Sequence, residues 1–146
     1  MNRDKDTGNI SKDGMTGLNS KAYFLVSLEQ SINELSLPNA AQNTGLVAVF
    51  LRNVPQETVV SVAELVDKQT DYATHYKLGN DDVIAGVYVS AKTDVSQTLH
   101  AQLTARFPKA RLGIACKTIS ADNDAEKVLD SVAQDAYDAM LLQPAP

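Results

Sequence analysis

Tryptophan is absent from this sequence, and aromatic residues account for only 5% of its 146 residues. The core must therefore be built mainly from aliphatic side chains, which supply most of the 44% of residues that are hydrophobic. A chain of this length suits one domain. Such a domain buries about 70% of its unfolded surface, so it needs neither a disulfide nor a structural metal ion for stability.

The sequence has a single cysteine, Cys116, which excludes an internal disulfide. Cys116 lies in the apolar, strand-like run "RLGIACKTI" with no histidine beside it. We therefore interpret it as a small buried hydrophobe rather than as a reactive thiolate. A lone cysteine fits a reducing compartment, and we expect a cytoplasmic domain, whether or not its parent protein is anchored in a membrane.

Positive charge is also scarce. The chain has 13 Lys and Arg against 18 Asp and Glu, a net charge of −5. This balance argues against nucleic acid and against an anionic membrane surface as partners. Long hydrophobic runs are lacking too, since no stretch approaches the ~20 apolar residues of a membrane span. The first residues are also too polar for a signal peptide.

The remaining pattern alternates helices and strands. Apolar residues recur at helical spacing in some segments and form short continuous runs, typical of buried strands, in others. This order predicts an α+β fold, close to α/β in its alternation, in which helices cover a sheet that contains one antiparallel hairpin. The predicted helices are 20–37, 58–68, 93–107 and 124–142, and the predicted strands are 46–51, the two halves of a hairpin over 76–88, and 111–119. The predicted N-terminal caps are Asn19 or Ser20 for the first helix, Thr93 or Asp94 for the third, and the acidic stretch "ADNDAE" for the last.

The two ends of the chain have linker-like composition. Residues 1–12 are polar and contain glycine, which predicts a flexible leader. Residues 143–146, "QPAP", predict a tail or the start of a linker. The folded domain is therefore expected over residues 13–142.

The hairpin carries the most conspicuous polar group in the chain, "GNDD" at residues 79–82. Such a group is either a simple turn or an acidic site for a metal ion and a phosphate. His75 and His100 have no Cys, Asp or Glu at ligand spacing, so we predict that both are surface or edge histidines.

Four segments together resemble GGDEF domains. The first is "KDGMTGLNSKAYF", which resembles D-x-L-T-G-L-x-N-R, with Asp13, Thr16 and Gly17 matching and Lys21 in place of the arginine. "KLGNDDV" resembles R-x-G-G-D-E-F, "RLGIA" resembles S-I-G-I-A, and "VAQDAYDAM" resembles A-D-x-A-L-Y-x-A-K. The segments follow the family's order across residues 12–142, which makes the combination more specific than any one of them.

The resemblance implies a nucleotide-cyclase fold, with a mixed, mainly antiparallel sheet of the five-stranded type covered by helices. GGDEF domains are typically diguanylate cyclases, in which two facing domains each hold one GTP and together form cyclic di-GMP. The family's carboxylates hold two Mg²⁺ ions, which activate a 3′-hydroxyl and neutralise the triphosphate. The resemblance also implies a structural N-terminal turn, closed by a salt bridge between Asp13 and Lys21.

The positions that carry this chemistry depart from the family pattern. The two metal-binding aspartates of the central strand align with Phe50 and Arg52, and Mg²⁺ requires oxygen donors. The segment that grips guanine and ribose has no counterpart, because the stretch from this strand to the hairpin turn is shorter by roughly a dozen residues. The family's two phosphate-binding cations align with Met140 and Pro144.

The signature turn itself matches the family pattern at only some of its positions. Gly79 and Asp81 match the family, whereas Asn80 replaces a glycine and Asp82 replaces a glutamate that is one methylene longer. Mg²⁺ binds at about 2.0–2.1 Å and does not tolerate the shorter side chain without backbone movement. Val83 replaces the phenylalanine, which changes packing more than chemistry.

We therefore interpret the turn as a relic that serves as a hairpin turn, with Asn80 in the left-handed conformation that asparagine tolerates. Asp81 and Asp82 are expected to repel each other mildly, with Lys77 near enough to offset this. No bound metal is expected, and the two aspartates are only weak candidates for one.

These departures predict a catalytically inactive pseudo-enzyme, related to diguanylate cyclases, that acts as a regulatory or protein-interaction module in bacterial cyclic di-GMP signalling. The expected partner is another protein or a neighbouring EAL or sensor domain, and a homodimer is open. One alternative is a sensor that binds GTP or cyclic di-GMP. The other is a divergent active cyclase, for which Mg²⁺ and GTP would be required and Asp81 and Asp82 would be the metal ligands.

Overall fold

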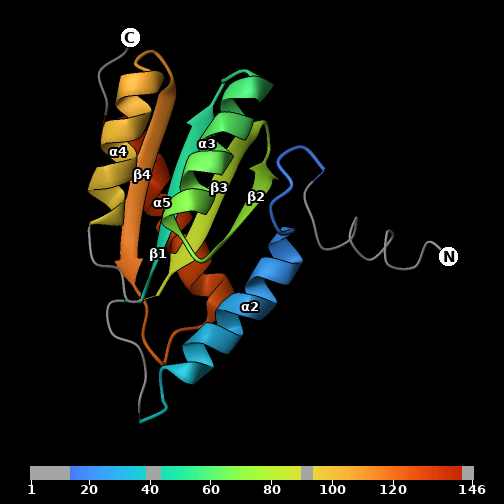
Figure 1. Cartoon of the computed structure of the whole chain (residues 1–146), viewed down its shortest axis with the longest axis vertical. Coiled ribbons are helices and arrows are strands. Elements are labelled where there is room, and N and C mark those ends of the chain that lie inside the picture. The colour runs from blue at the N-terminus through green and yellow to red at the C-terminus, as the bar shows by residue number, and fades with distance from the viewer. Residues whose placement is uncertain (1–13, 39–43, 90–93, 143–146) are drawn as a thin grey trace, which may run out of the picture.

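The computed structural model describes residues 14–38, 44–89 and 94–142. Within these residues, helices alternate with strands in the predicted order (Figure 1). None of these helices is long and apolar enough to cross a membrane. The helices are α2 (Lys21–Glu34), α3 (Gln56–Gln69), α4 (Val95–Arg106) and α5 (Ala125–Leu141), and the strands are β1 (Gly45–Arg52), β2 (Tyr72–Leu78), β3 (Asp81–Tyr88) and β4 (Arg111–Thr118).

The strands of the described chain form one four-stranded sheet in the order β2-β3-β1-β4. Every neighbouring pair of strands is antiparallel. The mainly antiparallel sheet is thus confirmed, but the expected five-stranded type is wrong for the described residues. The physical reason is that the sequence contains only four apolar runs of strand length, and each of them is already used.

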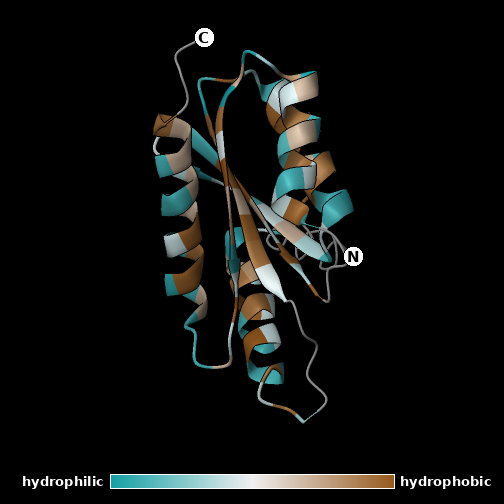
Figure 2. Ribbon diagram, turned by 90° about the vertical axis from the view of Figure 1, so that its left-hand side faces the viewer, coloured by the Kyte–Doolittle hydropathy of each residue, from teal (hydrophilic) through white to brown (hydrophobic). Residues whose placement is uncertain are grey.

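Side-chain alternation along the strands gives the sheet two apolar faces. On one face, Val47, Val49 and Ile84 pack with α3 and α4. On the other, Ala48, Phe50 and Ala85 pack with α2 and α5. Figure 1 shows α3 and α4 in front of the sheet and α5 behind it, and Figure 2 shows hydrophobic colour along the middle of the strands between these layers. The central strand β1 is buried on both faces, as its continuous apolar sequence predicts.

Three of the helices begin at side-chain caps that the sequence predicts. Ser20, Asp94 and Asp124 each accept a hydrogen bond from the backbone N–H of the residue three positions later. Helix α3 instead begins after Pro55, which provides no side-chain cap, and it starts two residues before the predicted position. Proline is compatible with this position because helix-starting residues need no N–H donor.

Helix α5 lies unusually close to β4. A Cβ added to Gly113 would meet the backbone of Ala136 and of Met140, so only glycine permits this approach. Met140 is fully buried as a result. The position that aligns with a phosphate-binding lysine therefore belongs to the core.

The N-terminal turn is attached to the edge strand β2. Gly17 adopts a positive φ of 74°, and Thr16 accepts a hydrogen bond from the N–H of Leu18. Asn19 then pairs with Thr74 of β2 in a parallel bridge. Lys21 lies 4.6 Å from the centre of the Tyr76 ring, and Asp13, its predicted salt-bridge partner, lies outside the described residues.

Candidate functional site

The site that corresponds to the family's signature is the turn between β2 and β3. The strands end at Leu78 and resume at Asp81, which leaves a two-residue connection. Gly79 has a positive φ of 63°, whereas Asn80 does not adopt one. The prediction of a left-handed Asn80 is therefore wrong. A glycine at the first turn position already supplies the twist that an antiparallel hairpin needs, as in a type II′ turn.

The two aspartates of the turn face opposite sides of the sheet. Asp81 pairs across the hairpin with Leu78, and Asp82 pairs with Lys77. Because consecutive residues of a strand point to opposite faces, the two carboxylates diverge. The expected repulsion between adjacent side chains does not arise in this geometry, and the two carboxylates do not converge on one position.

Asp81 is held by Arg52, the last residue of β1. The Arg52 Nε and Nη2 atoms donate hydrogen bonds to the two carboxylate oxygens of Asp81, at 3.1 and 3.0 Å. Hydrogen bonding to Asp81, and then to Tyr137, raises the pKa of Arg52, which therefore remains a cation. The guanidinium also lies 5.3 Å from the centre of the Tyr137 ring. A cation thus stands where the family places a metal-binding carboxylate.

Asp82 is held by two residues of β2. The Nε2 atom of His75 lies 2.7 Å from Asp82 Oδ1, and the Nζ atom of Lys77 lies 3.2 Å from the same oxygen. The side chains of His75 and Asp82 are only 2% and 7% exposed. The contact predicted for Lys77 is present. His75 lies on the edge strand β2, which agrees with the predicted surface or edge position, but its side chain is buried, while His100 is exposed.

Phe50 fills the space beside Asp81. Its ring meets Tyr137 of α5 edge-on, with 5.1 Å between ring centres. A hollow of about 320 Å³ lies next to them, bounded also by Leu78 and Asp130. Its lining contains one carboxylate and no Lys or Arg. Val83, the last residue of the signature, is fully buried in the same core, so its role is packing.

The residues present do not fit Mg²⁺. Within the part of the chain that the structure describes, no group of three or more His, Cys, Asp or Glu side chains converges as a metal site would require. Asp81 and Asp82 point apart, and each already binds a cation of the chain itself, Arg52 and Lys77 respectively. Mg²⁺ needs oxygen ligands in near-octahedral geometry, which an arene and a guanidinium cannot provide. Pro144, the position of the second phosphate-binding cation, lies outside the described residues.

Sequence reasoning missed the pairing of His75 with Asp82, although a signal for it exists. In a hairpin with a two-residue connection, Lys77 must oppose Asp82, and His75 lies diagonally across on the same face. The pairing of Arg52 with Asp81 has no such local signal. The two residues are 29 positions apart and meet only because β1 and β3 are neighbours in the sheet.

No protein-family model matches this chain, and a comparison with curated protein sequences finds no match. Similar solved structures do exist. A microbial GGDEF domain studied for its interaction with cyclic di-GMP superposes with a TM-score of 0.65 at 12% identity, over 92% of this chain and 93% of the other. A sensory box/GGDEF family protein from Caulobacter crescentus gives 0.59 at 14% identity, over 91% and 99% of the two chains.

A third similar structure is the diguanylate cyclase SiaD from Pseudomonas aeruginosa, in complex with its activator SiaC. It superposes with a TM-score of 0.57 at 13% identity, over 94% of this chain but only 61% of SiaD. At such identities the likeness concerns the fold and not the chemistry. The resemblance read from four short motifs is confirmed at that level: this chain has the fold of a GGDEF domain.

Proposed function

We propose that this chain is a GGDEF-like domain without diguanylate cyclase activity, which serves as a regulatory or protein-interaction module in cyclic di-GMP signalling. Its fold supports the relation to diguanylate cyclases. The SiaD–SiaC complex supports a role for protein partners, because a domain of this fold occurs there in a protein that binds an activator. The partner of this chain is a separate protein or an adjoining EAL or sensor domain.

One observation carries the proposal of inactivity: both signature carboxylates are already engaged by side chains of the chain itself. Arg52 makes a two-point contact with Asp81, and His75 and Lys77 contact Asp82. Loading a metal ion there would require breaking these contacts and uncovering charges that are partly or fully buried, which is costly. The cyclase reaction depends on metal ions to offset the charge of the triphosphate. The carboxylates of this turn are already engaged and cannot bind those ions.

The test is incubation of the purified chain with GTP and Mg²⁺, followed by chromatography for cyclic di-GMP. We expect no product above a protein-free control. Turnover that disappears in Asp81→Asn/Asp82→Asn, and persists in the charge-matched variant Asp135→Asn/Asp138→Asn, would establish the divergent cyclase instead. Calorimetry with GTP and with cyclic di-GMP completes the test, because micromolar binding of either nucleotide would favour the sensor alternative.

A further inference from the structure

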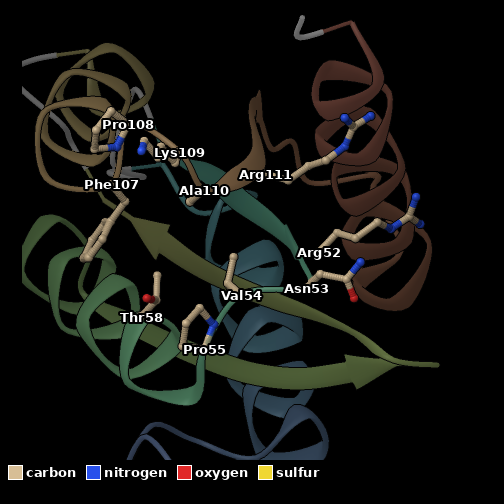
Figure 3. Close-up of a pocket in the computed structure, with 10 residues that line it drawn as sticks. All are labelled: Arg52, Asn53, Val54, Pro55, Thr58, Phe107, Pro108, Lys109, Ala110 and Arg111. Atoms are coloured by element: carbon tan, nitrogen blue, oxygen red, sulfur yellow. The ribbon is translucent and has the colours of Figure 1, made fainter. Parts of the chain in front are cut away.

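A second surface feature lies on the opposite face of the sheet from Phe50, between the start of α3 and the end of α4. It is a groove of about 500 Å³. The residues that line it come from the first turn of α3, from the loops that follow β1 and α4, and from the ends of β1 and β4 (Figure 3). Its walls are formed mainly by Val54, Pro55, Thr58, Phe107, Pro108 and Ala110.

The groove is open because both connections beside it are short. Only residues 53–55 join β1 to α3, and only residues 107–110 join α4 to β4. The first connection turns sharply at Asn53, which has a positive φ of 54°. Neither connection is long enough to fold over the groove, so the ring of Phe107 is left half-buried. The outer rim is exposed at Pro55 and Pro108, which makes this a surface groove rather than an enclosed cavity.

The charge around the groove is opposite in sign to that of the whole molecule. Its lining includes Arg52, Lys109 and Arg111 and contains no carboxylate. Arg106 adds a further cation, with its guanidinium 5.4 Å from the centre of the Phe107 ring. In a chain of net charge −5, this is a local concentration of positive charge.

Most of this positive charge is not neutralised. Arg52 is paired with Asp81, but Arg106, Lys109 and Arg111 make no ion pair with any carboxylate in the described chain. Arg111 lies opposite Arg52 at the ends of paired strands, and both side chains extend toward α5 (Figure 3). Lys109 and Arg106 therefore lie beside Phe107 at one end of the apolar surface, whereas the Arg111 side chain extends to the other face of the sheet.

We propose that this groove is the docking surface for an acidic peptide segment of a partner protein, in which an apolar side chain is flanked by Asp and Glu. The apolar anchor would lie against Phe107, Val54 and Pro55, in the desolvated centre that gives interfaces most of their affinity. The acidic flanks would meet Lys109 and Arg106, whose positive field selects against basic partners. This inference rests on the proposed interaction role and assigns that role a surface and a partner chemistry.

The test is selection of a random 12-residue phage-displayed library on the immobilised full chain. Selected peptides are then synthesised with a fluorescent label and titrated by anisotropy. We expect an apolar residue between acidic residues in the selected sequences. We also expect binding to weaken about tenfold in Arg106→Glu/Lys109→Glu. The control Lys68→Glu/Lys127→Glu makes the same charge change at two exposed lysines outside the groove, and should bind like the natural chain.

A second pair of variants distinguishes a loss of peptide binding from a loss of folding. Thr58→Glu places a carboxylate in the first turn of α3, where the helix dipole tolerates it, and Thr58→Gln has nearly the same size without the charge. The glutamate variant should bind the peptides more weakly than the glutamine variant. Equal binding by the natural chain and the Arg106/Lys109 variant, or selected peptides without acidic residues, would overturn the proposal. Preferential binding to phosphatidylglycerol vesicles through the same lysine and arginine would also overturn it. None of these outcomes depends on GTP turnover, which tests the proposed function separately.

Discussion

The guanidinium of Arg52 and the carboxylate of Asp81 form a planar, two-point contact between the end of β1 and the start of β3. An arginine fork matches both oxygens of a carboxylate, which fixes their relative orientation. In the family pattern, both positions carry carboxylates that serve metal ions. In this chain one of the two positions carries the cation Arg52 instead of an acid. Arg52 and Asp81 therefore attract each other and link the two strands.

We predict that Arg52 and Asp81 are energetically coupled. In a double-mutant cycle built from Arg52→Met and Asp81→Asn, each single variant should lower the urea midpoint of unfolding. The double variant should lose less than the sum of the two, because each single change leaves an unpaired charge or an unmatched polar group. Additive effects within error would show that the contact does not contribute to stability.

Asp82 should matter more for stability than any exposed aspartate. Its carboxylate is buried against His75, and removing it leaves the imidazole without its partner at Nε2. We expect Asp82→Ala to lower the free energy of unfolding by about 3 kcal/mol. The matched variant Asp135→Ala removes an exposed carboxylate and should change it by about 0.5 kcal/mol or less. Similar values for the two variants in urea titrations would contradict the buried pairing.

The sequence predicts the elements of this fold well because each is determined locally. Helix starts follow from the capping residues Ser20, Asp94 and Asp124, and the central strand follows from a continuous apolar run. The number of strands in the sheet was expected from the resemblance and not from the residues, and that expectation is wrong for the described chain. For the number of strands, the local apolar runs are therefore a better guide than the resemblance.

The site is less predictable because its contacts join distant segments. Arg52 can be recognised from the sequence as unsuitable for a metal ion, but its partner becomes evident only once β1 is placed next to β3. The edge position of His75 can be predicted, but its burial cannot, because a lone histidine in an edge strand gives no sign of which face it occupies. Its burial follows from the register of the hairpin, which sets it on the same face as Asp82.

The close approach of α5 to β4 leads to a prediction about Gly113. In Gly113→Ala the added methyl group meets backbone atoms of α5, which cannot move aside as a flexible side chain can. We expect a loss of about 3 kcal/mol in the free energy of unfolding. Gly14→Ala is the control, because an added Cβ there has no atom within 4 Å. A nearly unchanged stability for Gly113→Ala would mean that the helix and strand are farther apart.

Stability should fall at alkaline pH. Burial raises the pKa of Tyr72, Tyr76 and Tyr88 above the ordinary value of 10.0. Above about pH 10 the unfolded chain therefore binds fewer protons than the folded chain, so the free energy of unfolding decreases as pH rises. This stability is fully present below about pH 10 and is lost as pH passes through the raised pKa values of the folded protein.

Urea titrations at about pH 8 and about pH 11 measure this effect. Tyr76→Phe should reduce the loss between the two conditions, and its hydroxyl has no hydrogen-bond partner in the described chain that would be sacrificed. Tyr23→Phe is the control, because Tyr23 is 50% exposed. A pH dependence that is the same in the natural chain and in Tyr76→Phe would contradict the role of this buried phenol.

The central claim is that the signature carboxylates are already engaged by Arg52, His75 and Lys77 and cannot hold a divalent metal ion. The most direct test is titration of the isotopically labelled chain with Mn²⁺ while the backbone amide signals of residues 79–83 are followed by NMR, because a bound paramagnetic ion broadens nearby signals. We predict no selective broadening at these residues in the natural chain or in Asp81→Asn/Asp82→Asn. Selective broadening at low Mn²⁺ concentration that disappears in the double variant would contradict the claim.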